Sequence, residues 1–176
     1  MNSARRAAHA STVRLYLVRH AIAAERGPDW PDDSLRPLTH KGRARFRQVV
    51  QGLARQGVDV DVILTSPFVR AEQTARLLAA GISPEPLVEL TAALAPGQAP
   101  DAVIRALEPY AGSTGVALVG HEPDLGLLAA RLIGATYPLE FKKGGVCRID
   151  VPGLPPAAHG HLVWHATPKL LRSSRR

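Results

Sequence analysis

Two arginines and two histidines stand at places in this sequence where they could act together on an anion. Arg19 and His20 directly follow the apolar run Leu15–Val18, and His121 directly follows a second apolar run. Arg70 lies shortly after a third one. Guanidinium groups bind phosphoryl oxygens through paired hydrogen bonds, and one histidine can attack phosphorus while a second donates to its oxygens. These residue types therefore predict phosphoryl-group chemistry.

Short apolar runs predict the strands that carry these residues. We expect buried strands at about Val13–Val18, Val60–Leu64 and Gly115–Val119, each followed by apolar residues at helical spacing. Alternating strands and helices up to residue 134 predict an α/β fold with a mainly parallel sheet and helices on both faces. Two closing strands, Gly145–Val151 and His161–His165, can form a hairpin that makes the sheet mixed.

In a parallel sheet the carboxyl ends of the strands meet at one edge, where α/β proteins bind ligands. A strand at about Glu85–Val88 leads to Glu89, a carboxylate that can serve as an acid. The helix after the second strand is expected to begin with Ser66 as N-cap and Pro67 at the first helical position. Its free N–H groups and positive dipole end then face the same edge, which makes Ser66 a candidate for phosphate binding. We expect one crevice that collects the catalytic candidates Arg19, His20, Arg70, Glu89 and His121.

Each of these residues also has an ordinary structural explanation. Taken alone, an arginine or histidine at a strand end is usually a surface or hydrogen-bonded structural residue. Ser66 alone is more often only a helix cap, and Glu89 alone is more often a solvated acid in a loop. The functional interpretation rests on four strand ends that carry such residues together.

The sequence lacks the familiar patterns of metal and nucleotide chemistry. The segment His121-Glu122-Pro123-Asp124 has no second histidine four residues on, and no cysteine lies near a histidine. Neither a glycine-rich P-loop nor a Gly-x-Ser-x-Gly motif occurs. We therefore expect no metal and no cofactor.

Length and composition indicate a single globular domain. The 176 residues are 45% hydrophobic and 21% charged, and no apolar stretch approaches the ~20 residues of a membrane helix. We expect a disordered tail over residues 1–12, one domain over 13–168 and a basic tail over 169–176. The first twelve residues lack the apolar core of a secretory signal, and the single Cys147 cannot form an internal disulfide, so we expect a cytoplasmic protein.

The formal net charge of +7 is carried partly by the two ends of the chain. Such ends are usually solvated, although they could also attract an anionic substrate or a nucleic acid. The few aromatic residues do not alternate with basic ones, as they do on surfaces that stack single-stranded bases. We therefore expect no nucleic-acid partner and no membrane partner.

Three segments resemble the motifs of the histidine phosphatase, or phosphoglycerate mutase-like, superfamily. Leu17–Ala21 (LVRHA) resembles its Arg-His-Gly signature, with alanine where glycine is commonest. Ser66–Thr74 (SPFVRAEQT) resembles its second arginine motif, and Val119–Glu122 (VGHE) its second histidine motif. Further similarity, to the small SixA-type phosphohistidine phosphatases, lies in Arg36–Thr39, Gly42 and Val88–Leu90.

The resemblance spans residues 14 to 170 and implies a three-layer α/β/α sandwich around a mostly parallel sheet. It implies that His20 is the nucleophile that becomes phosphorylated and that Arg19, Arg70 and His121 form the phosphate pocket. Glu89 falls where many members of the family carry the proton donor.

We therefore expect a metal-independent phosphatase that works through a phosphohistidine intermediate and removes phosphate from phosphohistidine on proteins. One alternative is a phosphomonoesterase that acts on a small phosphorylated metabolite. Alternatives from other classes are a non-catalytic module that binds phosphoproteins and a basic nucleic-acid binder.

Overall fold

A mixed six-stranded sheet forms the centre of the molecule in the computed structural model, which describes residues 12–173. The strand order is β3-β2-β4-β1-β5-β6. Strands β1 to β4 run parallel, and β5 and β6 add an antiparallel pair beside β1. The strands are β1 Val13–Arg19, β2 Val62–Thr65, β3 Leu87–Leu90, β4 Gly115–Gly120, β5 Val146–Val151 and β6 His161–Ala166.

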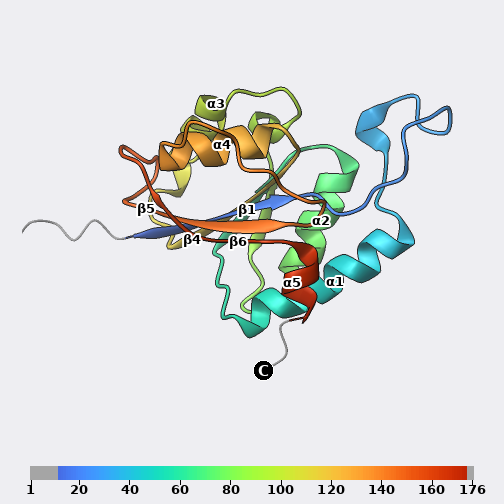
Figure 1. The fold of residues 1–176 in the computed structure, drawn as a ribbon, viewed down its shortest axis with the longest axis horizontal. Helices are drawn as coiled ribbons and strands as arrows, with labels where there is room; N and C mark the ends of the chain where they lie inside the picture. The colour runs from blue at the N-terminus through green and yellow to red at the C-terminus, as the bar shows by residue number, and fades with distance from the viewer. Residues whose placement is uncertain (1–11, 174–176) are drawn as a thin grey trace, which may run out of the picture.

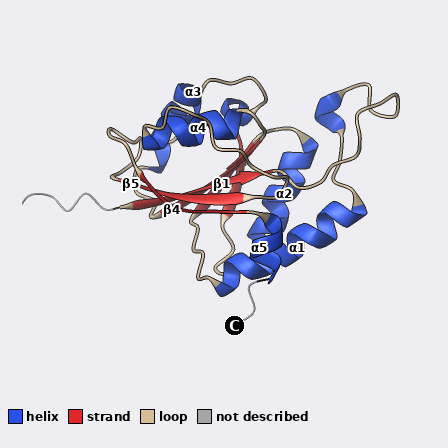
Figure 2. Ribbon diagram, in the orientation of Figure 1, coloured by secondary structure: helices blue, strands red, loops and turns tan. Residues whose placement is uncertain are grey.

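Helices cover both faces of the sheet (Figure 1, Figure 2). One face packs against α1, α2 and α5, and the other packs against α3 and α4. None of the helices in residues 12–173 is long and apolar enough to span a bilayer. The predicted three-layer α/β/α architecture is thus confirmed. The helices are α1 His40–Arg55, α2 Val69–Ala79, α3 Pro100–Ala106, α4 Asp124–Ile133 and α5 Pro168–Ser173, with 3-10 turns at Asp33–Leu35, Ala92–Leu94 and Glu108–Tyr110.

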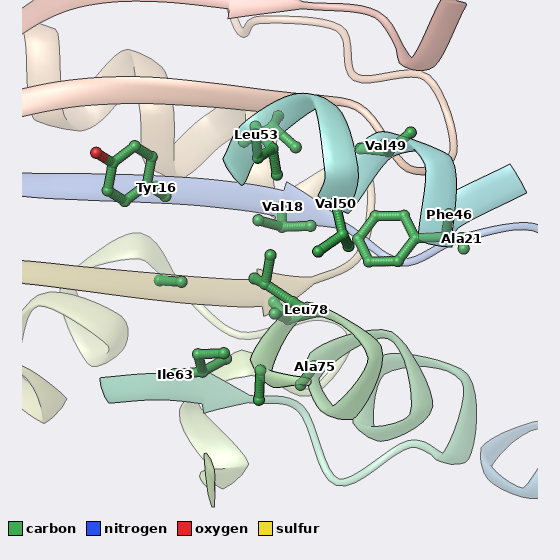
Figure 3. Packing of buried hydrophobic residues seen from close by; sticks show 14 of the residues in the cluster. Tyr16, Val18, Ala21, Phe46, Val49, Val50, Leu53, Ile63, Ala75 and Leu78 are labelled. Carbon is green, nitrogen blue, oxygen red and sulfur yellow. The ribbon is translucent and has the colours of Figure 1, made fainter. Parts of the chain in front are cut away.

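Helix α1 follows from local sequence signals. The Thr39 side chain accepts a hydrogen bond from the Gly42 N–H at 2.9 Å, so Thr39 caps the helix as expected. Apolar residues at helical spacing form its buried face, which Figure 3 shows packed against Val18 of β1 and Leu78 of α2. These apolar residues of α1 are Phe46, Val49, Val50 and Leu53.

The last helix, α5, extends the fold past the domain end expected at residue 168. Leu171 of α5 is buried against α1, where a Cβ added at Gly52 would lie only 2.0 Å from the Leu171 carbonyl oxygen. The absence of a side chain at Gly52 therefore lets the two helices approach closely. Residues 1–11 and 174–176 of the two expected tails lie outside the described residues.

Helix α2 begins later than its sequence suggests. Phe68 is the N-cap and Val69 the first helical residue, so Ser66 is not the cap and Pro67 is not the first residue of the helix. The Ser66 hydroxyl oxygen instead accepts a hydrogen bond from the Phe68 N–H at 3.3 Å. A serine hydroxyl competes in this way for a backbone N–H two residues on and forms a turn before the helix.

Strand β3 also begins later than expected, at Leu87 instead of Glu85. Pro86 has no N–H with which to join the ladder of β2, so the strand cannot include it without losing a hydrogen bond. The strand also ends later than expected, at Leu90 instead of Val88, so Glu89 lies inside it, opposite Leu64 of β2, and not after its end.

Strand β5 carries the single cysteine of the chain. Cys147 is fully buried between Leu17 of β1 and His165 of β6. Burial raises the pKa of its thiol to about 12. The thiol is therefore protonated at neutral pH and packs as a small apolar side chain.

Candidate active site

A cavity of about 340 Å³ lies at the carboxyl ends of β1 and β4. It forms where the sequence predicts a crevice, because β1 and β4 are parallel neighbours that end at Arg19 and Gly120. The loop after β1, the start of α2 and the loop before β5 complete its walls. The lining residues are Arg19, His20, Ala23, Ala24, Glu25, Arg26, Arg36, Arg70, Pro96, His121, Glu122 and Lys143.

His20 is buried in the cavity wall and oriented by the backbone. Its Nδ1 lies 2.7 Å from the Ala21 carbonyl oxygen. A carbonyl oxygen only accepts hydrogen bonds, so Nδ1 carries the hydrogen and Nε2 keeps its lone pair. Burial, assisted by the charges of Arg70 and Arg19 and opposed by the Ala21 hydrogen bond, lowers the pKa of His20 to about 3. At neutral pH His20 is therefore an uncharged imidazole with a free nucleophilic nitrogen.

His121 lies beside His20, with ring centroids 5.2 Å apart. Its Nε2 is 2.8 Å from the Ser66 hydroxyl oxygen, which also accepts the Phe68 N–H. The Ser66 hydroxyl can donate its hydrogen to Nε2, and in that tautomer the ring hydrogen of His121 is on Nδ1. Burial and the charges of His20 and Arg70 lower the pKa of His121 to about 3. His121 is thus neutral, and in the tautomer in which Ser66 donates to Nε2 it offers its Nδ1–H to a ligand.

Backbone carbonyls and one carboxylate hold the two arginines. Arg19 donates from Nη1 to the Phe141 carbonyl oxygen at 2.6 Å. Arg70 donates from Nη1 to the Asp33 carbonyl oxygen at 2.7 Å and from Nη2 to the Asp33 carboxylate at 3.0 Å. The Arg70 guanidinium also lies 4.9 Å from the centre of the Phe68 ring. Both guanidiniums are therefore fixed before any ligand enters.

Three buried side-chain nitrogens in residues 12–173 have no hydrogen-bond partner: Arg19 Nε, Arg70 Nε and His121 Nδ1. All three belong to residues that line the same cavity. A buried donor without a partner costs about 1–3 kcal/mol, so native proteins rarely keep one without a functional reason. A tetrahedral oxyanion offers several acceptor oxygens at once. The arrangement therefore fits a phosphoryl group next to the free Nε2 of His20.

The sequence did not predict that Asp33 binds three arginines at this site. Its carboxylate accepts hydrogen bonds from Arg26 at 2.9 Å, Arg36 at 2.8 Å and Arg70 at 3.0 Å. Burial alone would raise the pKa of Asp33, but the Arg36 hydrogen bond and the positive charges of Arg70, Arg36 and Arg26 lower it to about 2. The long irregular loop after the first strand and the Arg36–Thr39 resemblance were the signals available, and neither identifies a partner for Asp33.

Glu89 does not join the cavity. Its carboxylate accepts a hydrogen bond from the Tyr110 hydroxyl at 2.7 Å, and it is absent from the cavity wall. The expectation that Glu89 meets the two histidines is corrected, because Glu89 sits within β3 and pairs with Leu64.

The carboxylates that line the cavity are Glu25 and Glu122. Glu122 accepts a hydrogen bond from the Phe141 N–H at 3.0 Å, and burial raises its pKa. Glu122 therefore helps to fix the position of Phe141, whose carbonyl oxygen accepts a hydrogen bond from Arg19. No group of three or more His, Cys, Asp or Glu side chains suited to a metal ion occurs in the part of the chain that the structure describes.

Comparison with known proteins agrees with this fold and site. The family model of the Histidine phosphatase superfamily (branch 1) matches residues 15–95. Phosphohistidine phosphatase SixA of Escherichia coli is 30% identical over 167 residues, which are 93% of this chain and 99% of that protein. An uncharacterized protein of Picosynechococcus is 42% identical over 139 residues, 76% of this chain and 82% of the relative.

Solved structures show the same architecture. The structure of the protein histidine phosphatase SixA complexed with tungstate has a TM-score of 0.78 and 26% identity. The similarity covers 89% of this chain and 98% of that one. Fold, site and sequence similarity thus define a phosphatase of the histidine phosphatase superfamily, to which this chain belongs. Within the superfamily it is of the SixA type.

Proposed function

We propose that this phosphatase hydrolyses phosphohistidine on proteins through a covalent intermediate on His20. The observation that carries the proposal is the free Nε2 of His20 beside three unpartnered donor nitrogens. Similarity to Escherichia coli phosphohistidine phosphatase SixA over 93% of the chain supports the substrate class. The exposed residues Glu25, Arg26 and Lys143 form part of the cavity wall, so a side chain on a protein surface can enter.

The first step transfers the phosphoryl group from substrate to enzyme. Nε2 of His20 attacks phosphorus, a new P–N bond forms, and the P–N bond to the substrate imidazole breaks. The leaving imidazole takes a proton from solvent on its other ring nitrogen, so it departs as a neutral ring. Arg19, Arg70 and the His121 N–H stabilise the charge on the phosphoryl oxygens during transfer.

The second step restores the enzyme. Water attacks the phosphorus of phosphorylated His20, its proton passes to solvent, and the P–N bond to His20 breaks. Inorganic phosphate leaves and His20 returns to the neutral form that burial favours. In this scheme Arg19, Arg70 and His121 bind phosphate, and Ser66 acts through His121 by fixing its tautomer.

A screen of phosphohistidine-bearing proteins against a panel of phosphorylated metabolites tests the proposal. We expect kcat/KM to be highest for phosphohistidine proteins and lost in the His20→Ala variant. A preference for a small phosphoester by several orders of magnitude would make the enzyme a phosphomonoesterase instead. Binding of phosphoproteins without turnover would indicate a non-catalytic module.

A further inference from the structure

Helix α1 carries an unusual set of charges. Its sixteen residues, HKGRARFRQVVQGLAR, include five lysines and arginines and no aspartate or glutamate. In contrast, the first turns of α2, α3 and α4 contain Glu72, Asp101 and Asp124. Acidic residues are the ones that a helix N-terminus favours, because its dipole is positive there.

The charges of α1 work against the stability of the helix that holds them. Lys41 lies in the first turn, where a cation opposes the dipole, and Lys41 and Arg45 are like charges four residues apart. Within residues 12–173 neither makes an ion pair, whereas Arg76 pairs with Glu72 and Arg131 with Asp101. Helix formation therefore does not explain why these two positions are basic.

The start of α1 lies next to the catalytic cavity. The Thr39 N–H, just before the helix, donates to the carbonyl oxygen of Ile22 at 3.0 Å, two residues after His20. A Cβ added at Gly42 would lie 2.0 Å from that same carbonyl oxygen. Figure 1 shows α1 beginning on the side of the molecule where β1 ends.

The loop before β5 also lies next to the catalytic cavity. The Gly144 N–H donates to the carbonyl oxygens of Arg19 and His20, each at 3.1 Å. A Cβ added at Gly144 would lie 3.3 Å from the ring of Phe46 on α1 and 3.6 Å from Pro168 of α5. The exposed Lys142 and Lys143 directly precede this glycine, and Lys143 lines the cavity.

Lys41 and Arg45 share the flank of α1 that faces α5. Helical spacing puts both of them in line with Gly52, and Gly52 contacts Leu171 of α5. Pro168 of α5 also lies beside Gly144, so the flank of α1 with the exposed Lys41 and Arg45 and the loop with the exposed Lys142 and Lys143 both border α5. We define these four residues, Lys41, Arg45, Lys142 and Lys143, as the basic rim.

We propose that the basic rim docks acidic side chains that surround the phosphohistidine of a partner protein. This inference rests on the proposed function, because only a protein substrate extends beyond the cavity. The rim is continuous with the cavity wall through Lys143, so the surface around an inserted phosphohistidine must lie against it. Complementary charge speeds encounter and selects partners.

A nucleic acid is the competing occupant of a basic surface. No Phe, Tyr or Trp is exposed on α1, because Phe46 is buried, so the helix lacks the row of large aromatic rings on which successive bases stack. Lys143 also joins the rim to the cavity whose proposed substrate is a phosphohistidine on a protein. Charge and position together therefore favour an acidic protein surface.

Two synthetic peptides test the docking proposal. Each contains one phosphohistidine, flanked in one peptide by aspartate and glutamate and in the other by serine and glycine. We expect kcat/KM to be about tenfold higher for the acidic peptide at low salt, and the preference to fade as salt is added. The triple variant Lys41→Gln/Arg45→Gln/Lys142→Gln should lose the preference, with unchanged rates on the neutral peptide and on p-nitrophenyl phosphate.

The triple variant Arg76→Gln/Arg105→Gln/Arg131→Gln is a matched control that removes three exposed cations from α2, α3 and α4. It should keep the preference for the acidic peptide. Equal kcat/KM for both peptides in the wild type would overturn the docking proposal and leave the proposed function intact. Hydrolysis of p-nitrophenyl phosphate but of neither peptide would overturn both.

Retention of RNA by the wild type should be no stronger than by the rim variant. RNA binding that depends on the rim, together with equal rates on the two peptides, would assign the basic rim to a nucleic acid and overturn the proposal.

Discussion

Asp33 holds Arg70 at two points, with its carbonyl oxygen on Nη1 and its carboxylate on Nη2. Arg70 thereby turns one side of its guanidinium toward the loop after β1, and its unpartnered Nε remains for a ligand. Asp33 also joins Arg26 and Arg36, two further residues of the cavity wall. One carboxylate therefore connects a catalytic candidate on α2 to the loop that borders the cavity.

Replacement of Asp33 by alanine should impair catalysis by releasing Arg70. We expect kcat/KM to fall by roughly tenfold to a hundredfold, the range for a misaligned donor of a preorganised site, and Asn to cost less than Ala. Vanadate inhibition distinguishes positioning from simple charge masking. If Asp33 positions Arg70, vanadate binds the variant more weakly; tighter binding would show that Asp33 only masks positive charge. Asp29→Ala, an exposed carboxylate of the same loop, is the control.

His20→Ala should abolish turnover and leave part of the phosphate affinity, because Arg19, Arg70 and His121 remain. Rapid quench of the wild type with labelled substrate should trap a phosphoprotein that is labile in acid and stable in base, as expected of a phosphoramidate. Full activity in His20→Ala would exclude a covalent role for this residue.

Acid should destabilise the fold through the two buried histidines. Burial lowers the pKa of His121 to about 3 in the folded state, while the unfolded chain binds the proton near pH 6.5. Stability that is present above pH 6.5 is therefore lost as the pH falls toward 3. At about pH 5 the loss from His121 should be on the order of 2 kcal/mol relative to neutral pH.

Urea unfolding of the wild type and of His121→Asn at these two pH values measures this contribution. The variant should lose less stability on acidification than the wild type, whatever its stability at neutral pH. Equal losses in the two proteins would mean that His121 is protonated in the folded state near its ordinary pKa.

The two glutamates should behave differently. Glu89 binds Tyr110 outside the cavity, so Glu89→Gln should leave kcat/KM nearly unchanged on both phosphohistidine and alkyl phosphoester substrates. Glu122→Ala should reduce kcat/KM by freeing the Phe141 segment that holds Arg19, whereas Glu122→Gln keeps an acceptor oxygen for the Phe141 N–H. If Glu122→Gln proves as harmful as Glu122→Ala, the carboxyl group takes part in proton transfer.

Activity should not depend on an added metal ion, since Arg19 and Arg70 already supply positive charge to the phosphoryl oxygens. EDTA should leave kcat unchanged, vanadate should inhibit, and Arg70→Ala should cost on the order of 10²-fold or more in rate. Loss of rate in EDTA that a divalent ion restores would contradict this expectation.

The end of β1 and the cap of α1 were predictable because their signals are local. The apolar run before Arg19 and His20 specifies β1, and Thr39 specifies the start of α1. Arg19 and His20 lie near His121 because β1 and β4 pair in parallel. The alternation of strands and helices in the sequence already predicts this parallel pairing.

The position of Glu89 was not predictable, because no local signal in the sequence shows that β3 continues past Glu89 to Leu90. Glu89 therefore lies inside the strand, where its carboxylate meets Tyr110. The pairing of Asp33 with Arg70 spans 37 residues and depends on the path of an irregular loop. No periodicity or spacing in the sequence encodes such a path.

The buried thiol in β5 makes opening of the core beside the sheet measurable. The Cys147 side chain packs in the core between the sheet and α4, so a thiol reagent can reach it only when the core on this face of the sheet opens. The chain has no other cysteine, so modification at this position gives a single signal. The rate at which the native protein is alkylated therefore measures how often the core between the sheet and α4 opens.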